Sequence, residues 1–127
     1  MKSNYADTLT FTAGGSGYNT LRIASWILNI PNVNVFMGCV GRDEYADLIV
    51  SKADEAGLVT TLQTHETATT ATCATLLTDQ NRSMVAHLGA ACEFTDNHLD
   101  HDENWNFIKN SQVFYITVNL IEYSNSL

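Results

Sequence analysis

The sequence predicts an α/β protein in which a partly parallel sheet is flanked by helices and carries a small β-hairpin. Strand-like and helix-like segments alternate over residues 8–57, and two short strand-like segments separated by a turn follow them. Alternating strands and helices are typical of parallel sheets with right-handed crossovers. With 127 residues, 45% of them hydrophobic, the chain has the size and composition of one folded domain.

The first strand–helix unit starts with alternating polar and apolar residues at Thr8–Ala13, which predict a strand. Gly14 and Gly15 follow, and Ser16 is the expected N-cap of a helix. Pro31 is expected to help end that helix. The apolar positions of the predicted helix recur at helical spacing: Leu21, Ile23, Ala24, Ile27 and Leu28.

The second unit repeats this order. Asn34–Val40 is apolar enough to predict a strand buried on both faces. Asp43 is the expected N-cap of the next helix, and Gly57 the residue that ends it. Gly41 lies between strand and helix, where its simplest use is to permit a turn.

The second half of the chain changes pattern. Thr70–Thr78 and Arg82–Leu88 predict two strands of a hairpin that turns at Asp79–Asn81. Asp96 is expected to open a short helix, and Gln112–Val118 to form another buried strand. Two tryptophans are expected to anchor the core: Trp26 and Trp105.

The charge and hydropathy of the chain exclude several classes of partner. Fourteen acidic residues against 6 basic ones give a formal net charge of −8, which disfavours nucleic acids because these bind mainly through phosphate contacts. No apolar run approaches the roughly 18 to 20 residues of a membrane-spanning helix, and the N-terminus lacks the apolar core of a signal peptide. We therefore expect neither a nucleic-acid nor a membrane partner.

The three cysteines are odd in number and show no CxxC spacing. This pattern favours free thiols in a reducing compartment. We expect a cytoplasmic protein, with the nucleus left open as a second location.

The turn at Gly14–Ser16 is the first candidate binding feature. Glycines let a backbone approach a ligand closely, and a helix N-terminus offers unpaired N–H groups to an oxygen. Asn19, one turn into the helix, can reach the same ligand with its amide. The alternative is an ordinary tight turn between strand and helix.

The predicted hairpin is the second candidate. Met84, Ala86 and Leu88 alternate along one strand and form an apolar stripe suited to a flat aromatic ring. Arg82 lies at the turn end of this stripe, where its guanidinium fits a phosphate. The alternative is a half-buried hairpin with a solvated arginine.

A third cluster, His98 and His101 among acidic residues, raises the question of a metal. Zinc needs converging ligands with a satisfied second shell, and a polar helix start explains these residues better. We therefore predict no metal site. Cys73 and Cys92 lack the basic neighbours that mark a nucleophile.

The order and spacing of these motifs resemble the core of the adenosine kinases, members of the ribokinase-like (PfkB) carbohydrate kinases. The resemblance spans nearly the whole chain and is therefore more specific than its pieces. Its positions are Ala13-Gly14-Gly15-Ser16, Asn19, Trp26, Gly38-Cys39-Val40-Gly41, Asp43, Thr72-Cys73-Ala74, Asn81-Arg82-Ser83, Ala90-Ala91, His98-Leu99, Trp105, Val113 and Tyr115-Ile116.

The resemblance implies a partial ribokinase-like domain over residues 1–127, truncated at both ends. Lid-forming strands are expected at about 5–12 and 70–89, and core βα units at about 13–66 and 95–120. The implied activity is ATP-dependent phosphorylation of adenosine to AMP in purine salvage, with ATP and Mg²⁺ as cofactors and adenosine as substrate. The family is usually monomeric, whereas this partial chain is expected to self-associate through uncovered apolar surface.

The resemblance also implies roles for individual residues. Three kinds of contact are expected, with the ribose hydroxyls, with the adenine ring and with the transferred phosphoryl group. The ribose would meet Gly15, Ser16 and Asn19, the adenine would meet Met84, Ala86, Leu88 and Leu120, and the phosphoryl group would meet Arg82.

Several positions depart from the family pattern. Leu120 replaces an aromatic residue, Gly17–Tyr18 replaces Thr-Gln, and Thr69–Thr72 replaces Pro-Thr-Gly-Thr with loss of the Pro and the Gly at Thr69 and Ala71. These changes bear on ligand affinity and on how the lid hinges.

Two family segments have no counterpart in the sequence. These are an Asn-Pro-Leu-Leu-Asp strand near the start and the Gly-Ala-Gly-Asp loop that cradles phosphates and supplies the base. We expect no turnover by this chain alone, because no group would accept the ribose 5′-hydroxyl proton. Two alternatives stay open: a non-catalytic remnant that binds a nucleoside weakly at most, and a ribokinase-like kinase acting on a sugar.

Overall fold

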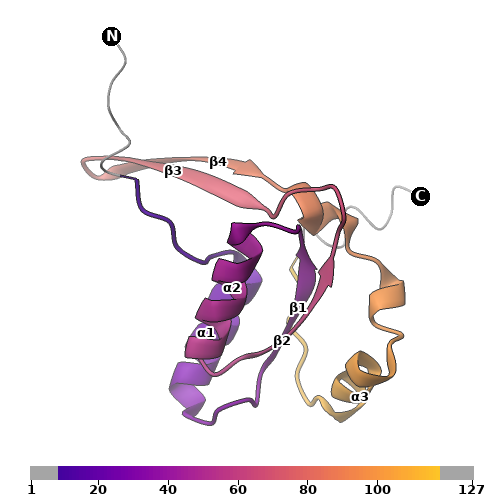
Figure 1. Ribbon diagram of the computed structural model, residues 1–127. Helices are drawn as coiled ribbons and strands as arrows, with labels where there is room; N and C mark the ends of the chain where they lie inside the picture. The colour runs from indigo at the N-terminus through magenta and orange to yellow at the C-terminus, as the bar shows by residue number, and fades with distance from the viewer. Residues whose placement is uncertain (1–8, 118–127) are drawn as a thin grey trace.

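The computed structural model describes residues 9–117 and confirms the α/β class (Figure 1). The helices and strands follow one another in a strand–helix core, a hairpin and a short helical end. In order they are α1 (Ser16–Leu28), β1 (Val35–Val40), α2 (Glu44–Glu55), β2 (Val59–Thr64), β3 (Thr72–Thr78), β4 (Asn81–His87), the 3₁₀ helices η2 (Gly89–Glu93) and η3 (Asp96–His98), and α3 (Asp102–Asn110).

The core is a parallel β–α–β unit with one additional helix. β1 and β2 pair in parallel from Val35↔Val59 to Val40↔Thr64, and α2 forms the crossover between them. Figure 1 shows α1 beside α2 on one side of these strands, with α3 on the other side. None of the described helices is both long enough and apolar enough to cross a membrane.

The buried cluster lies where the two helices meet the strands. It contains Ala13, Tyr18, Ala53 and Leu58, and the half-buried Phe36 packs against it. Tyr18 is only 2% exposed, and its hydroxyl donates a hydrogen bond of 3.1 Å to the carbonyl of Lys52. Since Tyr18 belongs to α1 and Lys52 to α2, this buried tyrosine holds the two helices together.

The ends of α2 follow the sequence-based prediction. The Asp43 carboxylate accepts a hydrogen bond from the backbone N–H of Ala46 at 3.0 Å, so Asp43 is the N-cap. Gly57 follows the helix with a φ of 68°, a conformation that favours glycine.

The predicted N-cap of α1 is wrong by one residue. Gly15 is the N-cap, with φ 98° and ψ 148°, and Ser16 is already the first helical residue. The reason is backbone geometry, because only glycine adopts this positive φ without strain. At the other end, Asn29 takes a left-handed conformation and ends the helix ahead of Pro31.

Two predicted strands are absent from the described part of the chain. Residues 9–13 and 113–117 belong to no strand, and the side chain of Val113 is 85% exposed. An alternating or apolar pattern becomes a strand only when a partner supplies the ladder hydrogen bonds. Within residues 9–117 neither segment has such a partner.

Sequence patterning also missed one strand and misplaced both tryptophans. β2 was not predicted, because its Thr-rich sequence VTTLQT carries little apolar signal. Trp26 is 80% exposed and Trp105 is 47% exposed, so neither is a core anchor. The buried cluster is made by Ala13, Tyr18, Ala53 and Leu58 instead.

The predicted hairpin is confirmed, although its first strand begins at Thr72 and not at Thr70. β3 and β4 pair antiparallel from Thr72↔His87 to Thr78↔Asn81. The turn is two residues long rather than three, since Asn81 already belongs to β4, and Asp79 has a φ of 53°. Every residue of both strands is exposed, so the hairpin stands away from the core.

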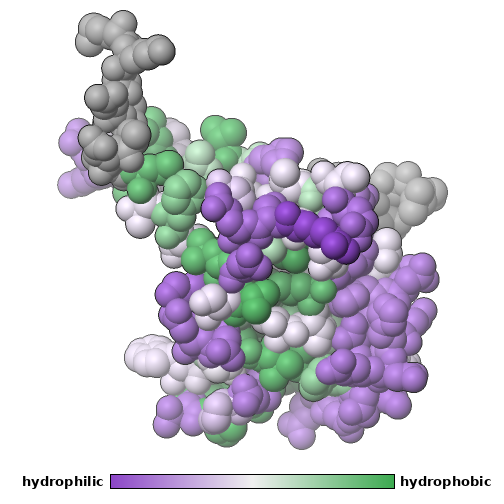
Figure 2. Space-filling view, viewed as in Figure 1, coloured by the Kyte–Doolittle hydropathy of each residue, from purple (hydrophilic) through white to green (hydrophobic). Residues whose placement is uncertain are grey.

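Many large apolar side chains of the described residues are exposed to solvent. Figure 2 shows hydrophobic residues along the hairpin and in the middle of the face it presents. The large exposed side chains include Trp26, Leu77, Val85 and Val113. Large exposed apolar side chains of this kind favour association.

We predict that the chain self-associates. Sedimentation velocity should show mass that rises with protein concentration, because burying these side chains removes apolar surface from water. The double variant Trp26→Glu, Val113→Glu should reduce this rise, whereas Ser51→Glu, a charge added at a polar exposed position of α2, should not. A single monomeric boundary for the wild type at every concentration would contradict the prediction.

Candidate functional site

The two predicted binding features lie at the same end of the molecule. β1 and β2 are parallel and α2 returns between them, so the N-terminus of α2 lies at the carboxyl ends of the strands. α1 runs the same way as α2, because the C-terminal residues of both helices line one groove, and its N-terminus therefore lies at this end too. Figure 1 shows the base of the hairpin at this end as well. In open α/β sheets, ligands bind outside the carboxyl ends of the strands.

The first feature is the turn that opens α1. A Cβ atom added to Gly14 or Gly15 would meet no other atom within 4 Å, so the space beside this turn is open. Gly15 supplies the N-cap without a side-chain hydrogen bond, and the first backbone N–H groups of α1 have no acceptor within the helix. Ser16 and Asn19 are both exposed here. The turn therefore offers several donors to an oxygen-rich ligand.

The second feature is one face of the hairpin. Arg82, Met84 and Ala86 alternate along β4 opposite Leu77, Thr75 and Cys73 of β3, so all six share one face. Arg82 lies near the turn and Ala86 near the base, as the sequence predicted.

Leu88 does not continue this stripe. β4 ends at His87, and Leu88 has a helical backbone, with φ −78° and ψ −30°, where η2 begins. The predicted strand was therefore one residue too long, because the start of η2 ends the strand alternation. Leu120, the eighth predicted site residue, lies outside the described residues.

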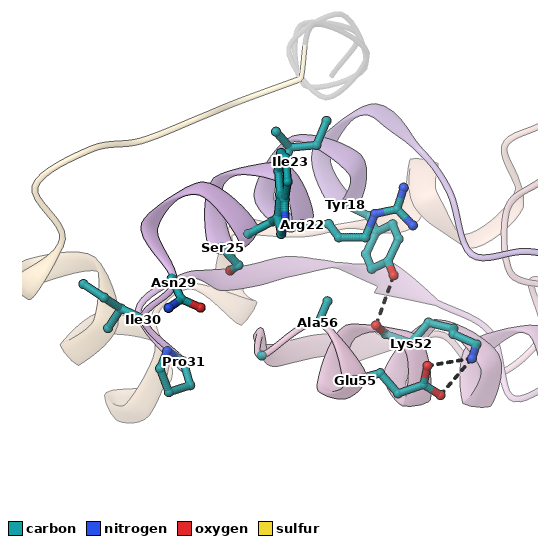
Figure 3. A pocket seen from close by; sticks show the side chains of 12 residues that line it. Tyr18, Arg22, Ile23, Ser25, Asn29, Ile30, Pro31, Lys52, Glu55 and Ala56 are labelled. Carbon is teal, nitrogen blue, oxygen red and sulfur yellow. Dashed lines mark hydrogen bonds and ion pairs between the residues drawn. The ribbon is translucent and has the colours of Figure 1, made fainter.

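No predicted site residue lines the groove between α1 and α2 (Figure 3). That groove is lined in part by Arg22, Pro31 and Glu55, and it lies toward the C-terminal ends of both helices, away from the hairpin. Two of its charged groups pair with each other, since the Lys52 ammonium lies 2.7 Å from the Glu55 carboxylate. Tyr18 points into this region, so its departure from the family pattern is a core substitution.

The histidine cluster has a structural role. The Nε2 atom of His98 lies 3.0 Å from the carbonyl oxygen of Thr61, and the Asn104 amide donates to the carbonyl of His98 at 2.7 Å. These contacts join the α3 region to β2. Within residues 9–117, no group of three or more histidine, cysteine or acidic side chains is placed to hold a metal ion. All three cysteines are free thiols.

A buried polar contact at the root of the hairpin was not predicted from the sequence. The backbone N–H of Thr70 donates to the Asp43 carboxylate at 2.7 Å, and the Thr70 hydroxyl accepts from the N–H of Gly41 at 2.9 Å. Thr70 is 1% exposed. Asp43 was predicted only as a helix cap, and no local signal pointed to Thr70, because this contact spans 27 residues.

The same hydrogen bonds set the charge state of Asp43. Burial raises the pKa of its carboxyl group, but hydrogen bonds from Thr70 and from the first turn of α2 outweigh burial and hold the pKa below its ordinary value. Asp43 is therefore a carboxylate at neutral pH and an acceptor for both partners.

Comparison with known proteins identifies the family of the chain. The model of the pfkB family of carbohydrate kinases matches residues 1–126. The chain therefore belongs to the pfkB family of carbohydrate kinases.

Within that family, the chain is similar to adenosine kinases. It is 38% identical to the adenosine kinase of Saccharomyces cerevisiae over 104 residues, which cover 82% of this chain and 30% of that protein. It is 33% identical to adenosine kinase 2 of Arabidopsis thaliana over 106 residues, which cover 84% of this chain and 31% of that protein. The chain thus spans about a third of the length of the curated relatives it matches.

Solved structures confirm the ribokinase-like fold. Anopheles gambiae adenosine kinase, solved with a di-adenosine tetraphosphate, superposes with a TM-score of 0.83 and 41% identity, covering 89% of this chain and 33% of that one. Schistosoma mansoni adenosine kinase with 2-fluoroadenosine gives a TM-score of 0.82 and 34% identity, covering 91% and 33%.

We predict that Asp43 makes the fold sensitive to acid. Because its folded pKa is depressed, its stabilisation is present above the ordinary aspartate pKa of about 3.9 and is lost as pH falls through the lower folded value. Asp43→Asn should lower the free energy of unfolding by about 1–2 kcal/mol at pH 7, and this difference should shrink below about pH 4.

Urea denaturation followed by circular dichroism at a series of pH values measures this difference. Asp100→Asn, at an exposed position, is the control and should change little at any pH. A constant gap between wild type and Asp43→Asn from pH 7 to the acid limit would contradict the prediction.

Proposed function

We propose that this chain forms the nucleoside-binding part of an adenosine kinase-like phosphotransferase, which transfers a phosphoryl group from ATP to adenosine and yields AMP. The observation that carries the proposal is the placement of the Gly14–Ser16 turn and the root of the hairpin at the carboxyl end of the parallel strands. Similarity to adenosine kinases over more than four fifths of the chain supports adenosine as the substrate.

The chemistry of each element fits one part of adenosine. The open turn at Gly15, with the exposed Ser16 and Asn19, presents hydrogen-bonding groups suited to ribose hydroxyls. Met84 and Ala86 present an apolar face suited to the flat base.

Two further predicted contacts belong to this proposal. Arg82 shares the hairpin face with Met84 and is assigned the transferred phosphoryl group, whose charge a guanidinium stabilises. Leu88 and Leu120 are kept as proposed adenine contacts, although Leu88 follows the strand and Leu120 is not described.

ATP and Mg²⁺ are proposed from the family alone. The 127 residues contain no Gly-Ala-Gly-Asp segment, and residues 9–117 contain no group of three or more histidine, cysteine or acidic side chains that could hold a metal ion. The residues present therefore do not fit a complete ATP site. We also propose that this chain by itself does not turn over, because nothing in it is assigned to accept the proton of the ribose 5′-hydroxyl.

A second candidate function is a non-catalytic nucleoside-binding remnant. The exposed hairpin favours it, since a lid that does not enclose its ligand leaves that ligand in water. Weak binding without turnover distinguishes this candidate from an active kinase.

We also propose a cytoplasmic location, with the nucleus as a second compartment. The three free thiols support a reducing environment.

We predict that Asn19 contributes to adenosine binding. Asn19→Ala should weaken binding about fivefold, the effect of losing roughly one hydrogen bond. Calorimetric titration of the chain with adenosine measures this, and Asn97→Ala, another exposed asparagine, is the matched control. Equal affinities for wild type and Asn19→Ala would contradict the assignment of Asn19, and no heat of binding for the wild type would contradict the proposed function.

We further predict no AMP formation by the isolated chain. Incubation with adenosine, ATP and Mg²⁺ should give no AMP above a protein-free blank, because the general base is lacking. A complete adenosine kinase in the same assay is the positive control. AMP that appears in proportion to the amount of this chain would refute its inactivity.

A further inference from the structure

The hairpin of β3 and β4 is joined by hydrogen bonds to the rest of the described residues at its base. All 14 residues of its two strands, seven in each, are exposed. Among the described residues, the two strands are hydrogen-bonded to each other and not to the helices or to β1 and β2. Its direction is therefore set where it joins the core, at Thr69–Thr70 and Gly89–Ala90.

The chain segments that enter and leave the hairpin are hydrogen-bonded to each other at its base. The N–H of Ala90 donates to the carbonyl of Thr69 at 2.8 Å, and Ala90 is fully buried. Gly89 has a φ of 47°, and a Cβ atom there would collide with the Thr69 carbonyl oxygen. Glycine at position 89 thus allows the segment that follows β4 to lie close to Thr69.

The segment that enters the hairpin is hydrogen-bonded, through Thr70, to the loop between β1 and α2. Thr70 accepts from Gly41 and donates to Asp43, and we call these three residues the root clasp. Gly41 has no room for a side chain, because a Cβ atom would meet the Ala68 carbonyl oxygen and would lie 2.8 Å from the N–H nitrogen of Thr70. The Asp43 carboxylate also caps α2 at Ala46, so the clasp joins the hairpin to a rigid helix.

We propose that Asp43 and Thr70 are positioning residues for nucleoside binding, which fix the direction of the hairpin relative to the turn at Gly15. This inference rests on the proposed function. Thr70 is buried and cannot meet the ligand itself, so it acts through the hairpin that carries Met84 and Arg82. A ligand held between two elements binds more tightly when those elements are already oriented.

The hydroxyl of Thr70 offers the sharper test. Thr70→Val keeps the shape of the side chain but removes the acceptor, which leaves the buried N–H of Gly41 without a partner. Thr70→Ser keeps the hydroxyl. A second variant, Asp43→Asn, retains one oxygen for the Ala46 cap but faces the Thr70 N–H with an amide that cannot accept.

The experiment measures backbone amide residual dipolar couplings in a weakly aligned sample of the labelled full chain. The background is Trp26→Glu, Val113→Glu, which limits self-association. Couplings of α1 and α2 report the core, and couplings of β3 and β4 report the hairpin. With an intact clasp, both sets should fit one alignment.

In Thr70→Val and in Asp43→Asn, the hairpin couplings should shrink or fit a different alignment while those of α1 and α2 stay unchanged. Thr70→Ser should restore the wild-type values. The dissociation constant for adenosine should rise about fivefold in Thr70→Val and return in Thr70→Ser.

Hairpin couplings that still fit the core alignment in both Thr70→Val and Asp43→Asn would overturn the proposal. So would equal adenosine affinities in Thr70→Val and Thr70→Ser. If the wild type does not bind adenosine while the couplings change as expected, the proposed function fails but the orienting role of the clasp stands.

Discussion

The Asp43 carboxylate is the contact on which the arrangement of this molecule depends. One oxygen accepts from the first turn of α2 and the other accepts from Thr70, at 3.0 and 2.7 Å. A single side chain therefore ends the β1–α2 loop, starts the helix and holds the hairpin to the core. Its depressed pKa follows from these hydrogen bonds, which favour the charged form over burial. Replacing it is expected to lower the stability of the fold and to loosen the attachment of the hairpin.

The features predicted correctly from sequence are those with a local cause. Asp43 caps α2 through a hydrogen bond three residues away, and the Asp79 turn brings two neighbouring strands together. Features that depend on distant partners were missed. Residues 113–117 have the composition of a strand but pair with no strand within residues 9–117, and β2 has a weak pattern but pairs with β1. Trp26 was predicted as a core residue because it is large and aromatic, but it is exposed. The helical spacing of apolar residues does not show which face of the helix packs against the core.

The candidate site was predictable to a similar degree. Glycines between a strand and a helix marked the turn at Gly15, although positive φ made Gly15 itself the cap instead of Ser16. Alternation along β4 placed Arg82, Met84 and Ala86 on one face, but alternation ends where η2 begins, so Leu88 was misplaced. The root clasp could not be predicted from local sequence patterns, because Thr70 and Asp43 are 27 residues apart and lie together through the pairing of β1 with β2.

The central claim is that the Gly15 turn and the hairpin face together bind a nucleoside. The most direct test is to titrate the isotope-labelled chain with adenosine and follow its backbone amide chemical shifts. The account predicts concentration-dependent changes concentrated at residues 14–19 and 82–86, which lie on different elements at one end of the fold. Changes confined to the groove between α1 and α2, or no changes at saturating adenosine, would contradict it.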